Sequence, residues 1–128
     1  MKLRKNDSED LGFALACMST SVISWPEFQE WAVHAIEQVE DAPSYLFDIL
    51  DTNKREDFKW RESIGFYPAS GLNSREEIAL DGIGYKRNNG WSTDAVSRVA
   101  ALAALKSNPQ VMERFCDAFP FLSIPKPD

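Results

Sequence analysis

The chain is poor in the residues that build metal and nucleophilic sites, with one histidine, His34, and two cysteines, Cys17 and Cys116, in 128 residues. One histidine with no cysteine beside it in sequence supplies too few ligands for a histidine–cysteine zinc site. As a general base, His34 would need a nucleophile that the sequence does not indicate. The cysteines lie near opposite ends of the chain among apolar residues, which predicts two small buried thiols in a reducing compartment. A disulfide between the termini is the alternative.

Motifs for nucleotide and calcium binding are also missing. There is no P-loop and no G-x-G-x-x-G, only a Gly-Ile-Gly fragment at 82–84 without a preceding strand pattern. Residues 51–62 begin like a calcium loop, but Arg55 stands where an oxygen ligand is needed and Glu56 where glycine is needed. We therefore predict no metal, no cofactor and no enzymatic activity. A small enzyme would require a pocket around His34 or a pair of carboxylates.

Long hydrophobic runs are absent. No apolar segment approaches the roughly 20 residues that a membrane-spanning helix needs. The basic residues at 1–5 resemble the start of a signal peptide, but the polar and acidic residues at 6–10 replace its apolar core. We therefore expect no contact with a membrane and a location in the cytoplasm.

What the chain does contain is typical of a folded domain. Hydrophobic residues make up 44% and aromatic residues 12% of the sequence, which excludes disordered and low-complexity classes. A chain of this size buries about two-thirds of its unfolded surface. Because β-branched alternation and internal repeats are absent, we predict an all-α fold: one compact domain over 1–128, a bundle of about six to seven short helices.

Capping signals and apolar spacing place these helices along the chain. The clearest covers 25–40, where Ser24, Pro26 and Glu27 form a start signal before an apolar stripe. In the first half of the chain, the predicted helices cover a segment from a cap at Asp7 or Ser8 to about 20, then 25–40, 45–51 and 53–63. In the second half, they run from 74 to the Asn-Asn-Gly at 88–90, from a cap at Ser92 or Thr93 to about 107, and from 109 to about 119.

Three expectations concern the second half of the chain. Gly82 and Gly84 are expected to weaken the helix that contains them. The tail over 120–128, with three prolines, is expected to lie extended over the surface. The alanine- and leucine-rich helix that follows Thr93 is expected to be the most buried, through Val96, Val99, Ala100, Ala103 and Ala104.

The net charge of −6 is concentrated in one stretch. Residues 27–57 contain nine acids and two bases, whereas the segments before and after are close to neutral. Such a surface repels a phosphate backbone, so direct nucleic-acid binding is not expected, and it attracts a cationic protein. The alternative is a solvated helix face that only keeps the protein in solution. The candidate partner-binding residues, here called the acidic band, are Glu37, Glu40, Asp41, Asp48, Asp51, Glu56 and Asp57.

Trp91 is a second candidate for partner binding, because it stands in a polar segment just before a predicted helix cap. One interpretation is that its ring packs over the adjoining helix. The other is that it forms an exposed anchor for a partner, since tryptophan is enriched in binding hot spots. In that case Arg87, Asn88 and Asn89 would form a polar rim around it.

Part of the sequence resembles a known group of proteins. The Ser-Trp at 24–25, the Trp-Ala at 31–32 and the Pro-Ser-Tyr at 43–45 are similar to a pattern in the N-terminal helices of some small immunity proteins. These proteins belong to bacterial contact-dependent inhibition and related polymorphic toxin systems. The resembling segments cover about a fifth of the chain, and no set of functional residues carries over position by position.

The resemblance implies a cytoplasmic protein that binds a cognate basic toxin domain, an RNase or DNase, and blocks its active site stoichiometrically. It implies a monomer before binding, with no cofactor. The acidic band agrees with this, since the substrate-binding surface of a nuclease is cationic. The alternative function is a regulatory or assembly subunit that buries the Trp91 segment in a protein partner or in a second copy of the chain.

Overall fold

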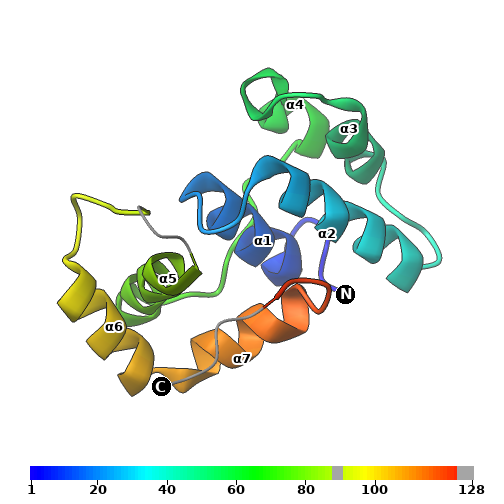
Figure 1. Ribbon diagram of the computed structural model, residues 1–128. Helices are drawn as coiled ribbons and strands as arrows, with labels where there is room; N and C mark the ends of the chain where they lie inside the picture. The colour runs from blue at the N-terminus through cyan, green and yellow to red at the C-terminus, as the bar shows by residue number, and fades with distance from the viewer. Residues whose placement is uncertain (88–90, 124–128) are drawn as a thin grey trace. The chain divides into compact units, whose positions relative to one another are not determined.

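The computed structural model describes residues 1–87 and 91–123, and over these residues the chain is all-α, as predicted (Figure 1). Seven α-helices and one 3₁₀ turn confirm the predicted number of helices. In chain order they are α1 (Glu9–Ser19), α2 (Trp25–Gln38), α3 (Tyr45–Asp51), η1 (Arg55–Asp57), α4 (Trp60–Ile64), α5 (Ser74–Arg87), α6 (Arg98–Ser107) and α7 (Pro109–Ala118).

The contacts within the chain group its residues into two compact units. The first unit comprises residues 1–18 and 24–71, and therefore most of α1 and all of α2, α3, η1 and α4. The second comprises residues 19–23 and 72–128, and therefore α5, α6 and α7.

Helix α2 begins where the capping signal predicts. The backbone N–H of Glu27 donates to the Ser24 hydroxyl (3.3 Å), and the Ser24 N–H donates to the Glu27 carboxylate (2.8 Å). This reciprocal pair satisfies two backbone donors that a helix start otherwise leaves without partners, and Pro26 fits the first turn, which needs no N–H. The helix ends at Gln38, two residues before the predicted end, because Val39 is extended.

The core of the first unit is built on the apolar stripe of α2. Phe28 and Trp31 are stacked with ring centroids 5.5 Å apart, and Trp25 packs against Phe28 (5.6 Å) and against Phe58 (5.5 Å). All four rings are buried. Large aromatic side chains remove much apolar surface from water, so this cluster contributes strongly to the stability of the unit.

Helix α3 is held against α2 by polar side chains as well as by its buried face. The indole N–H of Trp25 donates to the Thr52 carbonyl (2.9 Å). The Gln29 amide donates to the carbonyls of Ile49 (3.0 Å) and Thr52 (2.9 Å). These acceptors lie at the C-terminal end of α3, where backbone carbonyls lack partners within the helix. Side chains of α2 therefore complete α3 and fix its position.

The predicted helix over 53–63 is wrong in its extent. The segment forms the 3₁₀ turn η1 and, after an interruption, the one-turn helix α4. Phe58 adopts an extended conformation between them and turns its ring into the core. Burial of this one aromatic side chain overrides the helix propensity of the charged residues around it.

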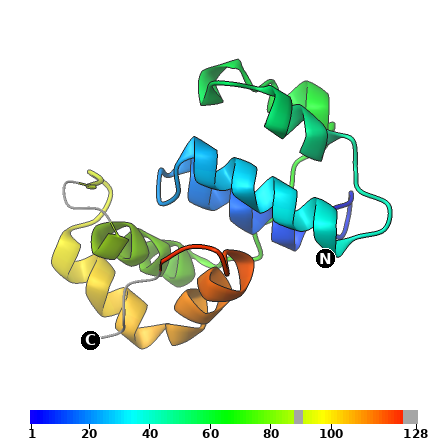
Figure 2. The same cartoon turned by 45° about the vertical axis from the view of Figure 1, so that its right-hand side comes forward.

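In the second unit, α5 and α6 make the most extensive helix contact, and both views show them side by side (Figures 1 and 2). A Cβ added to Gly82 would lie 2.5 Å from the Ala101 carbonyl oxygen, so glycine lets the two backbones approach closely. Gly82 therefore has a packing role that the expected weakening of α5 does not include. The capping pair of α5 is also shifted by one residue from the predicted Ser74, because Asn73 and Glu76 exchange hydrogen bonds of 2.9 and 3.1 Å.

Two further predictions for this unit are wrong. Helix α6 begins at Arg98 with Ser97 as its cap, whose hydroxyl accepts from the Ala100 N–H (3.2 Å). It is not the most buried helix, since Val99 is 80% exposed and its buried residues are Ala101 and Leu105. Among the other four residues expected inside, Ala100 and Ala103 are exposed, and Val96 and Ala104 are partly exposed. Alanine-rich composition indicates a helix but not which of its faces is covered.

The remaining predictions concern the tail and the cysteines. The start of the tail is a turn and not extended, because the Leu122 N–H donates to the Phe119 carbonyl (3.1 Å). Residues 124–128 of the predicted tail, and the Asn-Asn-Gly at 88–90, lie outside the described residues. Cys17 is a buried thiol, as predicted, while the Cys116 thiol is partly exposed, and the two are not joined in a disulfide.

The close approach of α5 and α6 predicts an unusual mutational effect. Gly82→Ala should lower the free energy of unfolding by about 1–3 kcal/mol, because the added methyl group overpacks the contact with Ala101. Helix propensity alone predicts the opposite, a gain of about 1 kcal/mol. Urea denaturation of both proteins measures the difference, and a more stable Gly82→Ala variant would contradict the described packing.

Candidate functional site

The acidic band begins at the end of α2. Glu37 lies in the last turn of the helix, and Glu40 and Asp41 follow in the connection to α3. The Arg4 guanidinium donates to the Asp41 carbonyl (2.6 Å) and to its carboxylate (3.3 Å). The Asp41 side chain is 97% exposed, so water and salt screen this ion pair and leave it weak.

Asp48 and Asp51 lie on the outer face of α3. The opposite face, with Tyr45, Leu46 and Ile49, is buried. Residues three apart on a helix are neighbours on its surface, so these two carboxylates form one pair of like charges facing water. The anchoring of α3 by α2 holds this face outward.

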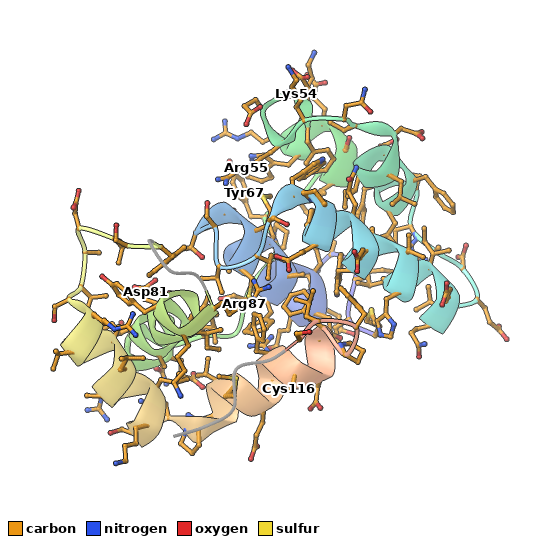
Figure 3. All side chains as sticks on the ribbon, in the orientation of Figure 1. Lys54, Arg55, Tyr67, Asp81, Arg87 and Cys116 are labelled. Carbon is orange, nitrogen blue, oxygen red and sulfur yellow. The ribbon has the colours of Figure 1, made fainter. Side chains whose placement is uncertain are left out.

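Glu56 and Asp57 complete the band in η1, next to Lys54 and Arg55, and Figure 3 labels both of these bases. All seven residues of the acidic band are exposed, and all belong to the first unit. Within residues 1–87 and 91–123, Asp41 is the only one of the seven in an ion pair. The other six carboxylates therefore form no ion pair within the described residues.

The division of charge between the units is uneven. The first unit contains 13 acids and seven bases, and the second contains seven of each. The whole net charge of −6 therefore belongs to the first unit. An excess of one sign of charge within one unit attracts cationic partners and raises their association rate.

Trp91 is packed within the second unit. Its indole N–H donates to the Thr20 carbonyl (3.2 Å), and its ring lies edge-on to Tyr85 with centroids 4.8 Å apart. A Cβ at Gly84 would lie 2.6 Å from the ring, so glycine at this position makes room for the indole. Trp91 is only partly exposed. These contacts favour the interpretation in which Trp91 packs over the adjoining helix.

The segment after Trp91 is held by Tyr85. The Tyr85 hydroxyl donates to the Val96 carbonyl (2.8 Å), and Arg98 donates to the Tyr85 carbonyl (3.2 Å) while lying over its ring (5.8 Å). On the same helix, Arg87 donates to the Val22 carbonyl and lies over the Phe115 ring of α7 (5.7 Å), and Figure 3 labels it. Side chains of α5 thus hold residues 19–23, the connection to α6 and α7 in place.

Other features of the described residues offer little chemistry. A groove of about 380 Å³ in the second unit is lined by apolar residues of α6 and α7, with Lys86 and Lys106 at its edge, and by no described carboxylate, histidine or thiol. No group of acids, histidines and cysteines among residues 1–87 and 91–123 has the geometry of a metal site. None of the helices in the described part of the chain has both the length and the apolar character needed to span a membrane.

One surface feature escapes prediction from sequence. Trp60, Arg61 and Tyr67 surround a hollow beside α4, together with Lys5 from the N-terminal segment. The predicted helix over 53–63 includes Trp60 and Arg61 without a binding role for either, and no site is predicted at Tyr67. The available signal was the density of aromatic residues on both sides of a glycine.

One carboxyl group outside the acidic band has a perturbed pKa. Burial raises the pKa of the Asp81 carboxyl on α5, and the negative charge of Glu77, one turn earlier, raises it further. Figure 3 labels Asp81 on this helix. Its ionised form is therefore less favourable in the folded protein than in the unfolded chain.

The chain has no significant match among protein-family models, curated proteins or solved structures. The similarity to immunity proteins therefore stays a prediction that depends on the residues named above.

The packing of Trp91 predicts a loss of stability when the ring is removed. Trp91→Ala should lower the free energy of unfolding by roughly 2 kcal/mol, because it exposes Gly84 and Tyr85 and leaves a gap. Val99→Ala, which truncates an exposed residue of the same unit, is the control and should change stability by less than about 0.5 kcal/mol. Equal stability of Trp91→Ala and the native protein would favour the exposed-anchor interpretation.

The raised pKa of Asp81 predicts a pH effect. Because this pKa is higher in the folded protein than its ordinary value of 3.8, the stability that protonated Asp81 contributes at low pH is lost as pH rises through the raised pKa. Asp81→Asn should therefore gain stability relative to the native protein as pH rises from about 4 towards neutrality. Thermal unfolding over this range measures the effect, with Glu113→Gln on α7 as the control, and parallel pH profiles for Asp81→Asn and the native protein would refute it.

Proposed function

We propose that the chain is an immunity protein that binds a cationic toxin domain through the acidic band. The observation that carries this proposal is the exposure of seven carboxylates on one unit, of which one is in an ion pair within the described residues. A surface that only needs to be soluble does not require charge of one sign to be concentrated in one unit. A surface that captures a basic partner does.

The proposed mechanism is occlusion of the toxin domain's active site. A nuclease binds its polyanionic substrate through a cationic groove, and neutralising phosphates dominates that affinity. A protein surface with several fixed carboxylates competes for the same groove and excludes the nucleic acid. One immunity protein then blocks one toxin domain, with no chemical step.

The anchoring of α3 supports this role. Preorganised groups lose less conformational entropy on binding than mobile ones. Asp48 and Asp51 are presented on a helix that Trp25 and Gln29 hold at its C-terminal end. The carboxylates of α3 therefore need little rearrangement to meet a cationic surface.

The proposal also defines the partner and the compartment. The band repels nucleic acid and anionic lipid, so the partner is a basic RNase or DNase domain and not its substrate. The chain acts as a monomer in the cytoplasm, where a delivered nuclease would reach its target.

The proposal is tested with the C-terminal domain of the product of the adjacent upstream gene, the expected place for a cognate toxin. Reversing Asp48 and Asp51 to lysine should slow association roughly ten-fold or more at low salt and reduce its salt dependence, with a smaller effect on dissociation. Surface plasmon resonance at two salt concentrations measures both rates. A nuclease assay shows whether inhibition by the native protein saturates at one-to-one stoichiometry.

The matched control reverses Glu113 and Asp117 on α7, which are also exposed but belong to the neutral second unit. It changes the net charge by the same amount and should alter association much less than the α3 variant. Equal effects of the two variants would mean that net charge and not the acidic band governs binding. A folded, active toxin domain that the native chain neither binds nor inhibits would overturn the proposed function.

A further inference from the structure

The hollow beside α4 reverses the sign of charge within the acidic first unit. It measures about 350 Å³. Two cations and three aromatic rings line it, and none of its described lining residues is acidic. The lining residues are Lys5, Trp60, Arg61, Gly65, Phe66 and Tyr67.

A short helix and a glycine build the hollow. Helix α4 begins at Trp60 and is ended by Gly65, whose left-handed conformation (φ 80°) lets its N–H donate to the Arg61 carbonyl (3.1 Å). The chain then reverses, and Tyr67 comes to lie edge-on to Trp60 with ring centroids 5.6 Å apart. Nothing lies within 4 Å of a Cβ built at Gly65, so the hollow is open on this side.

The segments on both sides of the hollow are pinned. The Ala69 N–H donates to the hydroxyl of buried Ser8 (3.0 Å), and Gly12 of α1 lies directly against the Ala69 carbonyl. Lys5 stands in a tight turn that Arg4 and Asp7 close with two backbone hydrogen bonds of 3.1 and 2.9 Å. The hollow is therefore a preformed feature of the unit and does not depend on a mobile loop.

Its side chains are available for binding. Tyr67 is 78% exposed, while the aromatic residues of the α2 core are buried. The Arg61 guanidinium lies over the Trp60 ring (5.4 Å) and is exposed. Across the described part of the chain, neither Lys5 nor Arg61 forms an ion pair. Tryptophan, tyrosine and arginine are the residues most enriched in binding hot spots.

We infer that this hollow is the specificity anchor of the toxin interface and takes an aromatic or aliphatic side chain of the toxin domain that stands beside an acidic residue. The inference rests on the proposed function. The hollow follows the acidic band directly in the chain, since Trp60 is three residues after Asp57. A toxin surface that spans both must present basic residues to the band and an acid to Lys5 and Arg61.

The cationic hollow allows discrimination between basic partners, which the acidic band alone does not provide. Seven exposed carboxylates attract any basic protein and discriminate poorly between them. A cationic position within the same surface penalises basic partners that place a base there and rewards the one that places an acid there. An adjoining hollow of about 280 Å³ is also lined by Lys5 and Tyr67, and its lining includes Asp7 and Glu9, so carboxylates lie close to this cationic position.

The test uses Arg61→Glu, for which two models predict opposite results. If acidic charge alone governs binding, this variant binds the toxin domain more tightly, because the chain becomes more acidic. If Arg61 meets an acid of the toxin, the variant binds it at least about ten-fold more weakly. Polylysine, a polycation without acidic groups, is the second probe and should bind Arg61→Glu as tightly as the native protein or more tightly.

Tyr67→Ala tests the aromatic part of the anchor. It should raise the dissociation rate of the toxin complex at least about ten-fold and change the association rate by less than about three-fold, since anchors act mainly on dissociation. Binding of polylysine should be unchanged. Val99→Ala on α6 is the matched control, because Val99 is as exposed as Tyr67 but lies in the second unit. Circular dichroism establishes that each variant is folded.

These experiments distinguish failure of the specificity anchor from failure of the proposed immunity function. If Asp48 and Asp51 reversal slows association while Arg61→Glu and Tyr67→Ala bind the toxin domain like the native protein, the anchor is wrong and the acidic band stands. If Tyr67→Ala weakens polylysine and toxin binding equally, the hollow has no role in specificity. If the native chain does not bind the toxin domain, the proposed function fails and the anchor fails with it.

Discussion

The first unit depends on the burial of one face of α2. Phe28 and Trp31 stack in the core, and Trp25 and Gln29 bind the carbonyl end of α3, so both helices have one face committed to the interior. The charged residues of this segment then have only the outer faces left to occupy. Since carboxylates are far more costly to bury than to expose, the apolar stripe and the acidic surface are two results of one pattern. Burial of one face of α2 therefore both stabilises the unit and leaves its carboxylates on the surface.

The second unit is stabilised in another way. Gly82 and Gly84 allow a neighbouring backbone and the Trp91 ring to approach α5 closely, and the polar side chains of α5 bind the surrounding segments. Its acids and bases are equal in number. The proposed binding function is therefore assigned to the first unit, where attraction by the acidic band and discrimination by the hollow beside α4 are separate physical effects. The band acts over several ångströms through water, and the hollow acts only on contact.

Local signals in the sequence were sufficient for α2, because the Ser24–Glu27 capping pair and the apolar spacing indicate the same start. They failed where the decisive contact is distant in sequence. Ser97, and not the predicted Ser92 or Thr93, caps α6, and Tyr85 on the previous helix binds the Val96 carbonyl and holds the preceding segment out of the helix. The acidic band was predictable, because charged side chains are expected at the surface and their exposure therefore follows from residue type alone. The hollow was not, because Lys5 reaches it from the other end of the unit's chain.

Hydrogen exchange of backbone amides, measured with and without the proposed partner, the C-terminal domain of the product of the adjacent upstream gene, tests the central claim most directly. Binding through the first unit predicts slower exchange at residues 37–57 and 60–67, with residues 98–118 of α6 and α7 unchanged. Protection confined to α5, α6 and α7 would contradict the account, because it would place the partner on the unit that has no net charge.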